Sequence, residues 1–215
     1  MTISIICFGV ILCSVRPVFA SMETREWTFR VYLDDAEIGS HRFSLTDFGD
    51  VREIRTEAKF NVPFLFFSVY TYRHRNTERW AGECLQAIES ETDVNGDRYS
   101  VLGATKDRSF VVSAVRGNTE NQSILPECVT TFAYWDRGFL LEPRLLNTQT
   151  GAYVNVEVEL IGADVINVRN ELIPSLHYRL MGNNIEVELW YSRDSEWLAL
   201  ESVTKGGRRL RYELT

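Results

Sequence analysis

The side chains of this sequence best suited to proton transfer lie in residues 60–80. Tyr72, His74 and Glu78 supply a phenol, an imidazole and a carboxylate, which are common general acids and bases. Such catalysis requires the three groups to converge on one ligand. If Asn76-Thr77 forms a two-residue turn, Glu78 lies on the opposite face of the sheet from Tyr72 and His74. We therefore keep an enzyme built on these residues as an alternative hypothesis and assign no catalytic residue.

The same turn would also pair side chains across the two strands that it joins. Arg75 would oppose Glu78 as an exposed ion pair. Arg73 would oppose Trp80, with its guanidinium within cation–π reach of the indole ring. On this interpretation the segment is a well-packed hairpin.

Aromatic rings are concentrated in the same segment and allow a second interpretation. Five phenylalanine and tyrosine rings lie between positions 64 and 72, more than one buried strand face can absorb. Pro63 has no N–H to donate to a strand ladder, so we expect the chain to bend there and to place residues 64–67 at a rim or under a lid. An apolar pocket with a polar-tipped lining would follow. Its expected ligand contacts are Phe64, Phe66, Phe67, Tyr72, His74, Trp80 and Trp135.

The histidines and glycines follow no motif for a metal or nucleotide site. His41, His74 and His177 lie far apart, without the HExxH or HxH spacing that would direct two nitrogens at one metal. The GxSxG, GxxxxGK[ST] and GxGxxG motifs are absent from the sequence. Residues 93–97 (DVNGD) begin like a calcium loop, but the glycine falls at position 4 rather than 6, so we interpret them as a hairpin turn. We predict no metal and no cofactor.

The N-terminus has the features of an export signal. Residues 1–15 form an apolar run that is too short for a stable membrane-spanning helix, which needs about 20 residues. Arg16-Pro17 interrupts the run, and Val18 and Ala20 supply small residues before a cleavage site at Ser21. We therefore expect a signal peptide over 1–20 and a periplasmic protein over 21–215, without a transmembrane span. If translation instead begins at Met22, the protein would be cytoplasmic.

Export would change both the cysteine content and the charge. Cys84 and Cys128 would remain in an oxidising compartment, either as a disulfide that closes a 44-residue loop or as two buried free thiols that never meet. Cleavage removes the cation Arg16 and no acid, so the net charge changes from −7 to −8. Such an acidic surface repels phosphate backbones at long range, and we expect no nucleic-acid partner.

Alternation of hydrophobic and polar residues predicts β-strands from Trp27 onward. Trp27, Phe29, Val31 and Leu33 would share one face of the first strand. Further strands are expected at 38–45, 51–62, 69–75, 78–94, 99–103, 110–115, 154–160, 165–172, 176–181, 185–191, 197–203 and 210–214. Asn95-Gly96 is a strong hairpin signal, and residues 162–164 (GAD) are expected to form another turn.

About a dozen antiparallel strands in a meander make a sheet that must curl, close or split to protect its edges. We therefore predict an all-β fold, either a closed barrel or a strongly curved half-barrel. Residues 116–150 lack both strand and helix periodicity, and we expect an irregular or short-helical crossing or lid there. The strands that follow would be marginal alone, so residues 21–215 are expected to form a single domain.

Several pieces of the sequence resemble an uncharacterised family of exported proteobacterial proteins, a domain of unknown function. The pieces are 27–34 (WTFRVYLD), 38–41 (IGSH), 70–74 (YTYRH), 78–80 (ERW), 145–151 (LLNTQTG) and 189–191 (LWY) before Trp197. The resemblance covers nearly all of 27–214, and LLNTQTG is its most specific piece. Gly82-Glu83-Cys84 departs from it, because glycine is expected directly before the cysteine. The resemblance implies export and an all-β fold of lipocalin-like or lipoprotein-carrier-like shape, and it implies no catalytic residue.

Three functions are consistent with these observations. The favoured hypothesis is a non-catalytic exported protein that binds an apolar, amphipathic or lipid-like ligand in its concave sheet. The enzyme hypothesis uses Tyr72, His74 and Glu78 in the same cavity. The third is an envelope interaction protein that docks through an open sheet edge or through Trp190-Tyr191 and Trp197. An exposed apolar patch around those rings, without an interior cavity, would favour docking.

Overall fold

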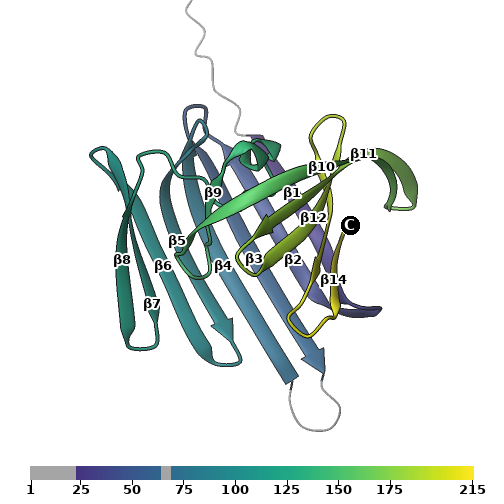
Figure 1. Cartoon of the computed structure of the whole chain (residues 1–215), viewed down its shortest axis with the longest axis horizontal. Helices are drawn as coiled ribbons and strands as arrows, with labels where there is room; N and C mark the ends of the chain where they lie inside the picture. Colours follow the sequence, from purple (N-terminus) through teal and green to yellow (C-terminus); the bar gives the residue numbers. More distant parts are fainter. Residues whose placement is uncertain (1–22, 64–68) are drawn as a thin grey trace, which may run out of the picture.

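The computed structural model describes residues 23–63 and 69–215, which form a strongly curved β-sheet (Figure 1). Each ladder between neighbouring strands is antiparallel. The described residues contain fourteen strands, so the predicted all-β class is confirmed with slightly more strands than the expected dozen. The elements are β1 Glu23–Leu33, β2 Ala36–Asp47, β3 Arg52–Pro63, β4 Val69–Ala81, β5 Cys84–Val94, β6 Asp97–Lys106, β7 Ser109–Arg116, β8 Thr119–Leu125, the 3-10 helix η1 Arg137–Leu141, β9 Arg144–Leu146, β10 Tyr153–Val168, β11 Glu171–Gly182, β12 Ile185–Ser192, β13 Trp197–Val203 and β14 Arg209–Leu214.

Strand pairing divides the sheet into two meanders. β1–β8 form the first and β9–β14 the second. The two meanders join where β1 pairs with β14, from Phe29 opposite Leu214 to Leu33 opposite Leu210. β8 and β9 are the two edges, so hydrogen bonds do not close the barrel. Of the two predicted shapes, the structure has the curved half-barrel.

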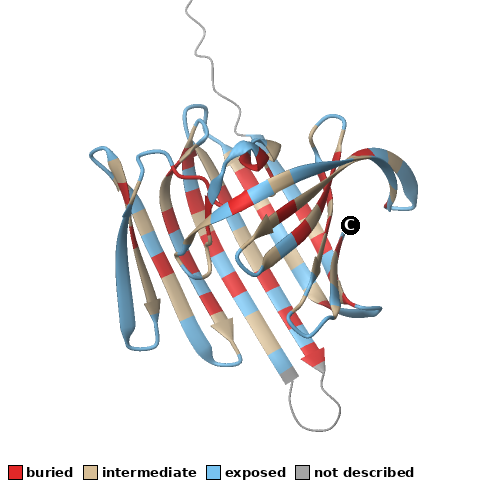
Figure 2. Ribbon diagram, viewed as in Figure 1, coloured by how far each residue is buried: buried red, intermediate tan, exposed pale blue. Residues whose placement is uncertain are grey.

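The hydrophobic alternation determines which face of the sheet is concave. Trp27, Phe29, Val31 and Leu33 of β1 are buried, whereas Arg30 between them is exposed. Figure 2 shows the same alternation of buried and exposed positions along the long strands. Because successive side chains of a strand point to opposite faces, the buried set lines the inner face and the charged set covers the outer face.

The chain between β8 and β10 crosses the inner face and closes one end of the half-barrel. The Leu85 N–H donates to the Val129 carbonyl oxygen at 2.9 Å, and the Leu146 N–H donates to the Thr130 carbonyl oxygen at 2.8 Å. A disulfide between Cys84 and Cys128 fixes the same segment to the start of β5, so the structure contains the bridge rather than two free thiols. η1 lies at this end, which we call the closed end (Figure 1). The crossing with a short helix is as expected.

Four predicted boundaries are wrong. The strand expected over 78–94 is divided between β4 and β5, because Gly82 takes a positive φ of 58° in the turn that joins them. β4 continues through Asn76-Thr77, because β3 and β5 hold it in register on both sides. β10 continues past Gly162, where the register shifts, and its hairpin turn lies at Arg169-Asn170, both with positive φ. β8 occupies part of the segment expected to be irregular, and as an exposed edge strand it carries no hydrophobic alternation. The Asn95-Gly96 turn is confirmed, with φ of 55° and 93°.

A close backbone approach at Gly39 shapes the other end, which we call the open end. The β1–β2 register shifts between Val31 and Tyr32, opposite Gly39, and such bulges increase local twist. A Cβ at Gly39 would lie 1.9 Å from the Lys59 carbonyl oxygen, and its φ is +149°. Only glycine therefore allows β2 and β3 to approach in this geometry.

Candidate functional site

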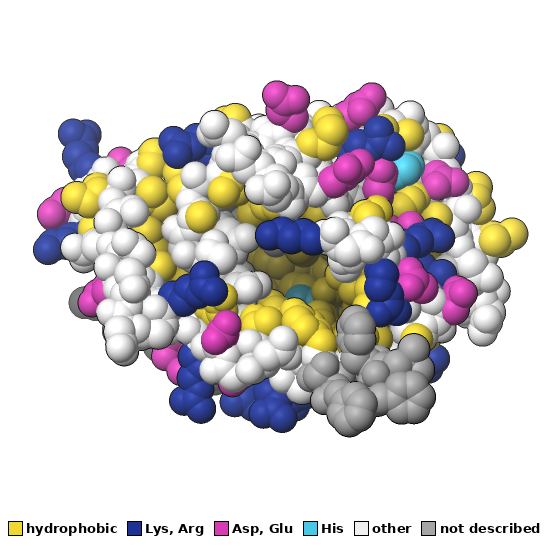
Figure 3. Space-filling model, turned by 60° about the horizontal axis from the view of Figure 1, so that its bottom comes forward, with side chains coloured by type: hydrophobic (Ala, Val, Ile, Leu, Met, Phe, Trp, Pro, Cys, Tyr) yellow, Lys and Arg dark blue, Asp and Glu magenta, His cyan; other side chains and the backbone are white. Residues whose placement is uncertain are grey.

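The half-barrel opens into a hollow at the end opposite η1. Figure 3 looks into this hollow and shows hydrophobic side chains on its walls and a histidine side chain at its floor. A depression of about 1410 Å³ at the open end is lined from both faces of β3–β7 and from the adjoining hairpin tips. It therefore continues around the rim, and only part of its volume belongs to the inner side.

One row of inward side chains crosses the wall of the hollow, and we call it the inner row. In strand order its members are His41, Ala58, His74, Thr92, Tyr99 and Arg116. Other aromatic rings of the inner face lie next to this row. Phe60 stacks on Tyr72 with ring centroids 5.2 Å apart, and the Tyr212 ring centroid lies 5.7 Å from that of His41. The wall thus combines aromatic surface with a few polar tips.

Both histidines of the inner row are neutral at pH 7. His74 Nδ1 lies 2.8 Å from Thr92 Oγ1, within hydrogen-bond distance, and burial lowers the pKa of His74 to about 4. Burial, with a smaller effect of His74, lowers the pKa of His41 well below its usual range. Neither ring nitrogen of His41 has a hydrogen-bond partner, and both are shielded from solvent. A neutral imidazole donates one hydrogen bond and accepts one, so the row offers polar groups without histidine charge.

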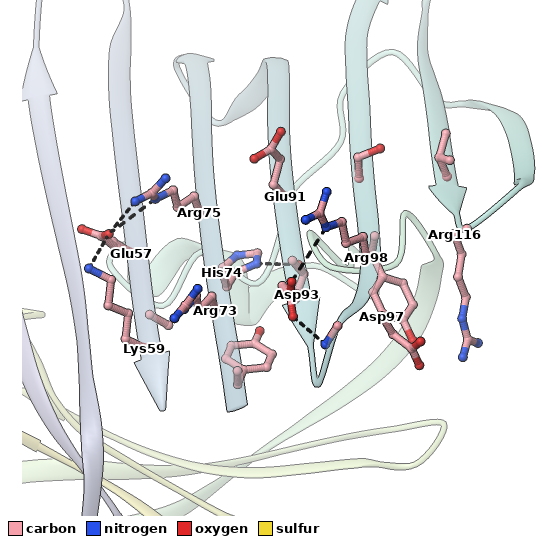
Figure 4. A pocket seen from close by; sticks show the side chains of 18 of the residues that line it. Glu57, Lys59, Arg73, His74, Arg75, Glu91, Asp93, Asp97, Arg98 and Arg116 are labelled. Carbon is pink, nitrogen blue, oxygen red and sulfur yellow. Dashed lines mark hydrogen bonds and ion pairs between the residues drawn. The ribbon is translucent and has the colours of Figure 1, made fainter. Parts of the chain in front are cut away.

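Charged side chains cover the outer face of the same strands (Figure 4). Glu57 Oε1 lies 3.1 Å from Lys59 Nζ and 3.4 Å from Arg75 Nη2. Asp93 Oδ2 lies 3.9 Å from Arg98 Nε. Exposed ion pairs of this kind contribute little to stability. Alternation places these groups on the opposite face from the inner row, so they form the outside of the rim.

Glu78 faces inward, and the predicted opposite face is wrong. Because β4 is continuous, Glu78 shares a face with Tyr72 and His74. It lies about 13 Å along the strand from His74, toward the closed end, at 3.3 Å per residue. Its carboxylate accepts hydrogen bonds from Asn76 Nδ2 at 2.7 Å, Trp80 Nε1 at 2.9 Å and Thr131 Oγ1 at 3.2 Å. The three candidate acid–base groups therefore share a face without converging on one ligand.

The side-chain pairs predicted around Asn76-Thr77 are wrong for the same reason. Arg75 lies opposite Glu57 on β3 and Glu91 on β5, not opposite Glu78. Arg73 lies opposite Lys59 and Asp93, so it cannot stack on Trp80. A strand held on both sides leaves no hairpin in which those pairs could form.

The structure divides the predicted ligand contacts between the hollow and the core. Tyr72 and His74 line the depression at the open end. Trp80 and Trp135 lie in the closed half, where their rings meet edge to face at 5.6 Å and are 2% and 7% exposed. These two tryptophans belong to the core rather than to the wall of the hollow. The remaining three, Phe64, Phe66 and Phe67, lie outside the described residues.

Four residues of this part of the inner face were not predicted from the sequence: Tyr99 and Arg116 line the depression, and His41 and Phe60 lie behind its lining. His41 has the same parity as the buried Phe43 on β2, so alternation alone would have placed it inside. The sequence pattern does not determine the register between strands, and that register places His41 beside Phe60 and Tyr99 beside Arg116.

The docking surface predicted at Trp190, Tyr191 and Trp197 is buried. Trp190 Nε1 donates to Asp164 Oδ2 at 2.8 Å, and Tyr191 Oη donates to the Tyr134 carbonyl oxygen at 2.8 Å. Trp197 is fully buried and packs on Phe29, with ring centroids 4.2 Å apart. The condition for the docking hypothesis, an exposed apolar patch around these rings, is not met.

Two further features, a membrane-spanning helix and a metal-binding cluster, are absent from the described residues. Within residues 23–63 and 69–215, no helix is long and apolar enough to cross a membrane. The same ranges bring no three His, Cys, Asp or Glu side chains together in a metal-binding group.

Comparison with known proteins identifies a family and a shared fold. The family model for the domain of unknown function DUF6134 matches residues 29–215. No curated protein matches the chain. A solved structure, the β-barrel-like protein of domain of unknown function DUF1849 from Brucella abortus, superposes with a TM-score of 0.62 at 10% sequence identity, covering 88% of this chain and 95% of that chain. At this identity the match shows a β-barrel-like fold alone.

Proposed function

Because the chain belongs to the DUF6134 family, whose function is unknown, we propose a function from the site itself: it binds one apolar or amphipathic ligand in the hollow and is not an enzyme. The observation that carries the proposal is the open hollow of Figure 3, whose walls are hydrophobic. Small-molecule sites are commonly concave and mostly apolar, with a few polar groups that fix orientation. Tyr72 and His74 supply such groups on the wall.

The unpartnered imidazole of His41 supports the same proposal. A buried polar group without a hydrogen-bond partner costs about 1–3 kcal/mol. Proteins retain few such groups, and each one calls for an explanation such as an absent ion, water or ligand. A hydroxyl or carbonyl group of a ligand that reached His41 after a small movement of Phe43 or Tyr212, its nearest rings, would satisfy one of its nitrogens.

Export is part of the proposal. The apolar run of residues 1–15 and the small residues before Ser21 support cleavage of a signal peptide. The disulfide between Cys84 and Cys128 supports an oxidising compartment, because such bonds are rare in the cytosol. We propose the periplasm as the location of residues 21–215.

A titration with the neutral fluorescent probe N-phenyl-1-naphthylamine tests ligand binding. We expect saturable binding at one site, and we expect Tyr72→Ala to weaken it about fivefold, since an aromatic contact contributes about 1 kcal/mol. Tyr32→Ala is the matched control, because the Tyr32 ring lies on the outer face against Arg211, 5.1 Å from its guanidinium carbon.

The titration can contradict the proposal in two ways. Unsaturable or absent fluorescence enhancement with the wild-type protein would remove the hollow as a binding site. Equal weakening by Tyr72→Ala and Tyr32→Ala, with unchanged melting temperatures, would place the probe elsewhere. Saturable binding that only Tyr72→Ala weakens is the expected result.

A further inference from the structure

Arg116 occupies a distinct position among the cations of the inner face. It lies at the open end, at the β7 end of the inner row, opposite Tyr99 on β6. Its guanidinium carbon lies 5.0 Å from the centroid of the Tyr99 ring, and this cation–π contact holds the side chain against the wall. Arg116 and Tyr99 both line the depression that contains Tyr72 and His74. The positive charge is therefore preorganised beside the aromatic surface.

Arg116 forms no ion pair within 4.0 Å among the described residues, unlike its neighbours on the outer face. Asp97 has inward parity on β6 and also lines the depression, yet it makes no such contact with Arg116. Two other arginines point inward on β1–β8, and both lie near the closed end. Arg52 Nη1 lies 3.2 Å from Asp136 Oδ2 in an ion pair, and the Arg25 guanidinium carbon lies 5.0 Å from the centroid of the Trp27 ring.

The other titratable groups of the inner row do not supply a competing positive charge. His74 is engaged with Thr92, and its pKa of about 4 leaves it neutral at pH 7. His41 is likewise neutral, because burial lowers its pKa. A ligand that lies along the row thus meets one cation, Arg116, and then the uncharged side chains of Tyr99, Thr92 and His74 on the way to Tyr72. The Asp97 carboxylate lies off this row, at the start of β6.

From this asymmetry we propose that the ligand is an anionic amphiphile whose carboxylate or phosphate head binds the Arg116 guanidinium. The inference rests on the proposed function and names the ligand class of the same hollow. A planar guanidinium with several N–H donors binds either anion through two parallel hydrogen bonds. The apolar chain would extend across β6, β5 and β4 to the stacked Tyr72 and Phe60 rings, about 15 Å away at 4.8 Å per strand.

The test compares cis-parinaric acid with its uncharged methyl ester by fluorescence titration. We expect the wild-type protein to bind both, and Arg116→Gln to weaken the acid about tenfold while leaving the ester unchanged, because a charge-assisted hydrogen bond is lost only with the anion. Arg98→Gln is the matched control, since Arg98 lies on the outer face beside Asp93 and should change neither affinity. Competition adds a second readout: dodecanoate or dodecyl phosphate, but not dodecanol, should displace the bound acid, and the stronger of the two identifies the head group.

The failures of the two proposals are distinguishable. If the wild-type protein binds neither the acid nor the ester, the proposed function fails and this inference fails with it. If the wild-type protein binds both and Arg116→Gln weakens neither, or weakens both equally, ligand binding stands and the role of Arg116 is overturned. Displacement by dodecanol as strong as that by the two anions would overturn it as well. Arg116 is exposed, so the variant should retain the wild-type melting temperature.

Discussion

Replacing both Cys84 and Cys128 with serine should lower the free energy of unfolding by about 4 kcal/mol. The disulfide closes a 44-residue loop, and removing that constraint raises the chain entropy of the unfolded state by this amount. Cys128 is exposed and Cys84 is partly buried, so little packing is lost and the effect reports the cross-link itself. A loss of this size corresponds to about 10 °C in melting temperature for a chain of this length.

Urea unfolding of the oxidised wild-type protein and the double variant measures this effect. The wild-type protein with its disulfide reduced is the control, and it should unfold with the double variant. A difference below about 1 kcal/mol would mean that hydrogen bonds such as Leu85 to Val129 hold the crossing segment without the bridge. In that case the disulfide would not be what fixes the closed end.

Substitutions of Glu78 should separate a large loss of stability from a pH effect. Glu78→Ala leaves the buried donors of Asn76, Trp80 and Thr131 without an acceptor, and we expect a loss of about 4 kcal/mol. Glu78→Gln keeps the shape. Its carbonyl oxygen can accept from Trp80 and Thr131. Once the Asn76 amide turns over, the introduced glutamine amide can donate to Asn76 Oδ1, which has no partner in the wild-type structure. We expect Glu78→Gln to be at least as stable as the wild-type protein at pH 7.

The pH dependence follows from the buried carboxylate. Burial raises the pKa of Glu78 from 4.5 to about 6, with the three hydrogen bonds opposing this shift. The folded state therefore binds the proton more tightly than the unfolded state does. The free energy of unfolding should fall by about 2 kcal/mol as the pH rises from 4.5 through 6, and should not change further from this group above that range.

The difference in unfolding free energy between the wild-type protein and Glu78→Gln isolates this contribution. Buried His74 acts in the opposite direction, because its lowered pKa makes stability fall as the pH drops from 6.5 toward 4. Both proteins contain His74, so its effect cancels in the difference. We expect Glu78→Gln to gain about 2 kcal/mol relative to wild type between pH 4.5 and pH 7. A difference that does not vary with pH would show that Glu78 titrates normally and is solvated.

Local pattern predicts much of the fold. Alternation such as that of Trp27, Phe29 and Val31 predicts strands because one face must be buried, and Asn95-Gly96 predicts a turn because both residues accept positive φ. Local pattern fails where neighbouring strands decide the outcome. Asn76-Thr77 resembles a turn, yet pairing with β3 and β5 holds it extended, and no local feature specifies the pairing of β1 with β14.

The candidate site was predictable only in part, for the same reason. Tyr72 and His74 stand out by residue type within an aromatic segment. Arg116 does not, because a lone arginine at the end of a short strand has no local signature. Its position beside the hollow depends on three strand registers, and register is a property of the assembled sheet. Trp80 stood out by type as well, but it lies 26 Å or so along β4 from Tyr72, in the core.

If the hollow holds one small amphipathic molecule, that molecule should accompany the protein through purification. Native mass spectrometry of the protein, purified from the periplasm of a producing bacterium without detergent, tests it most directly. We expect a polypeptide beginning at Ser21 that carries the added mass of one small molecule, and this mass should disappear after denaturation in organic solvent. A bare polypeptide that takes up neither N-phenyl-1-naphthylamine nor cis-parinaric acid would show that the hollow is not a ligand site.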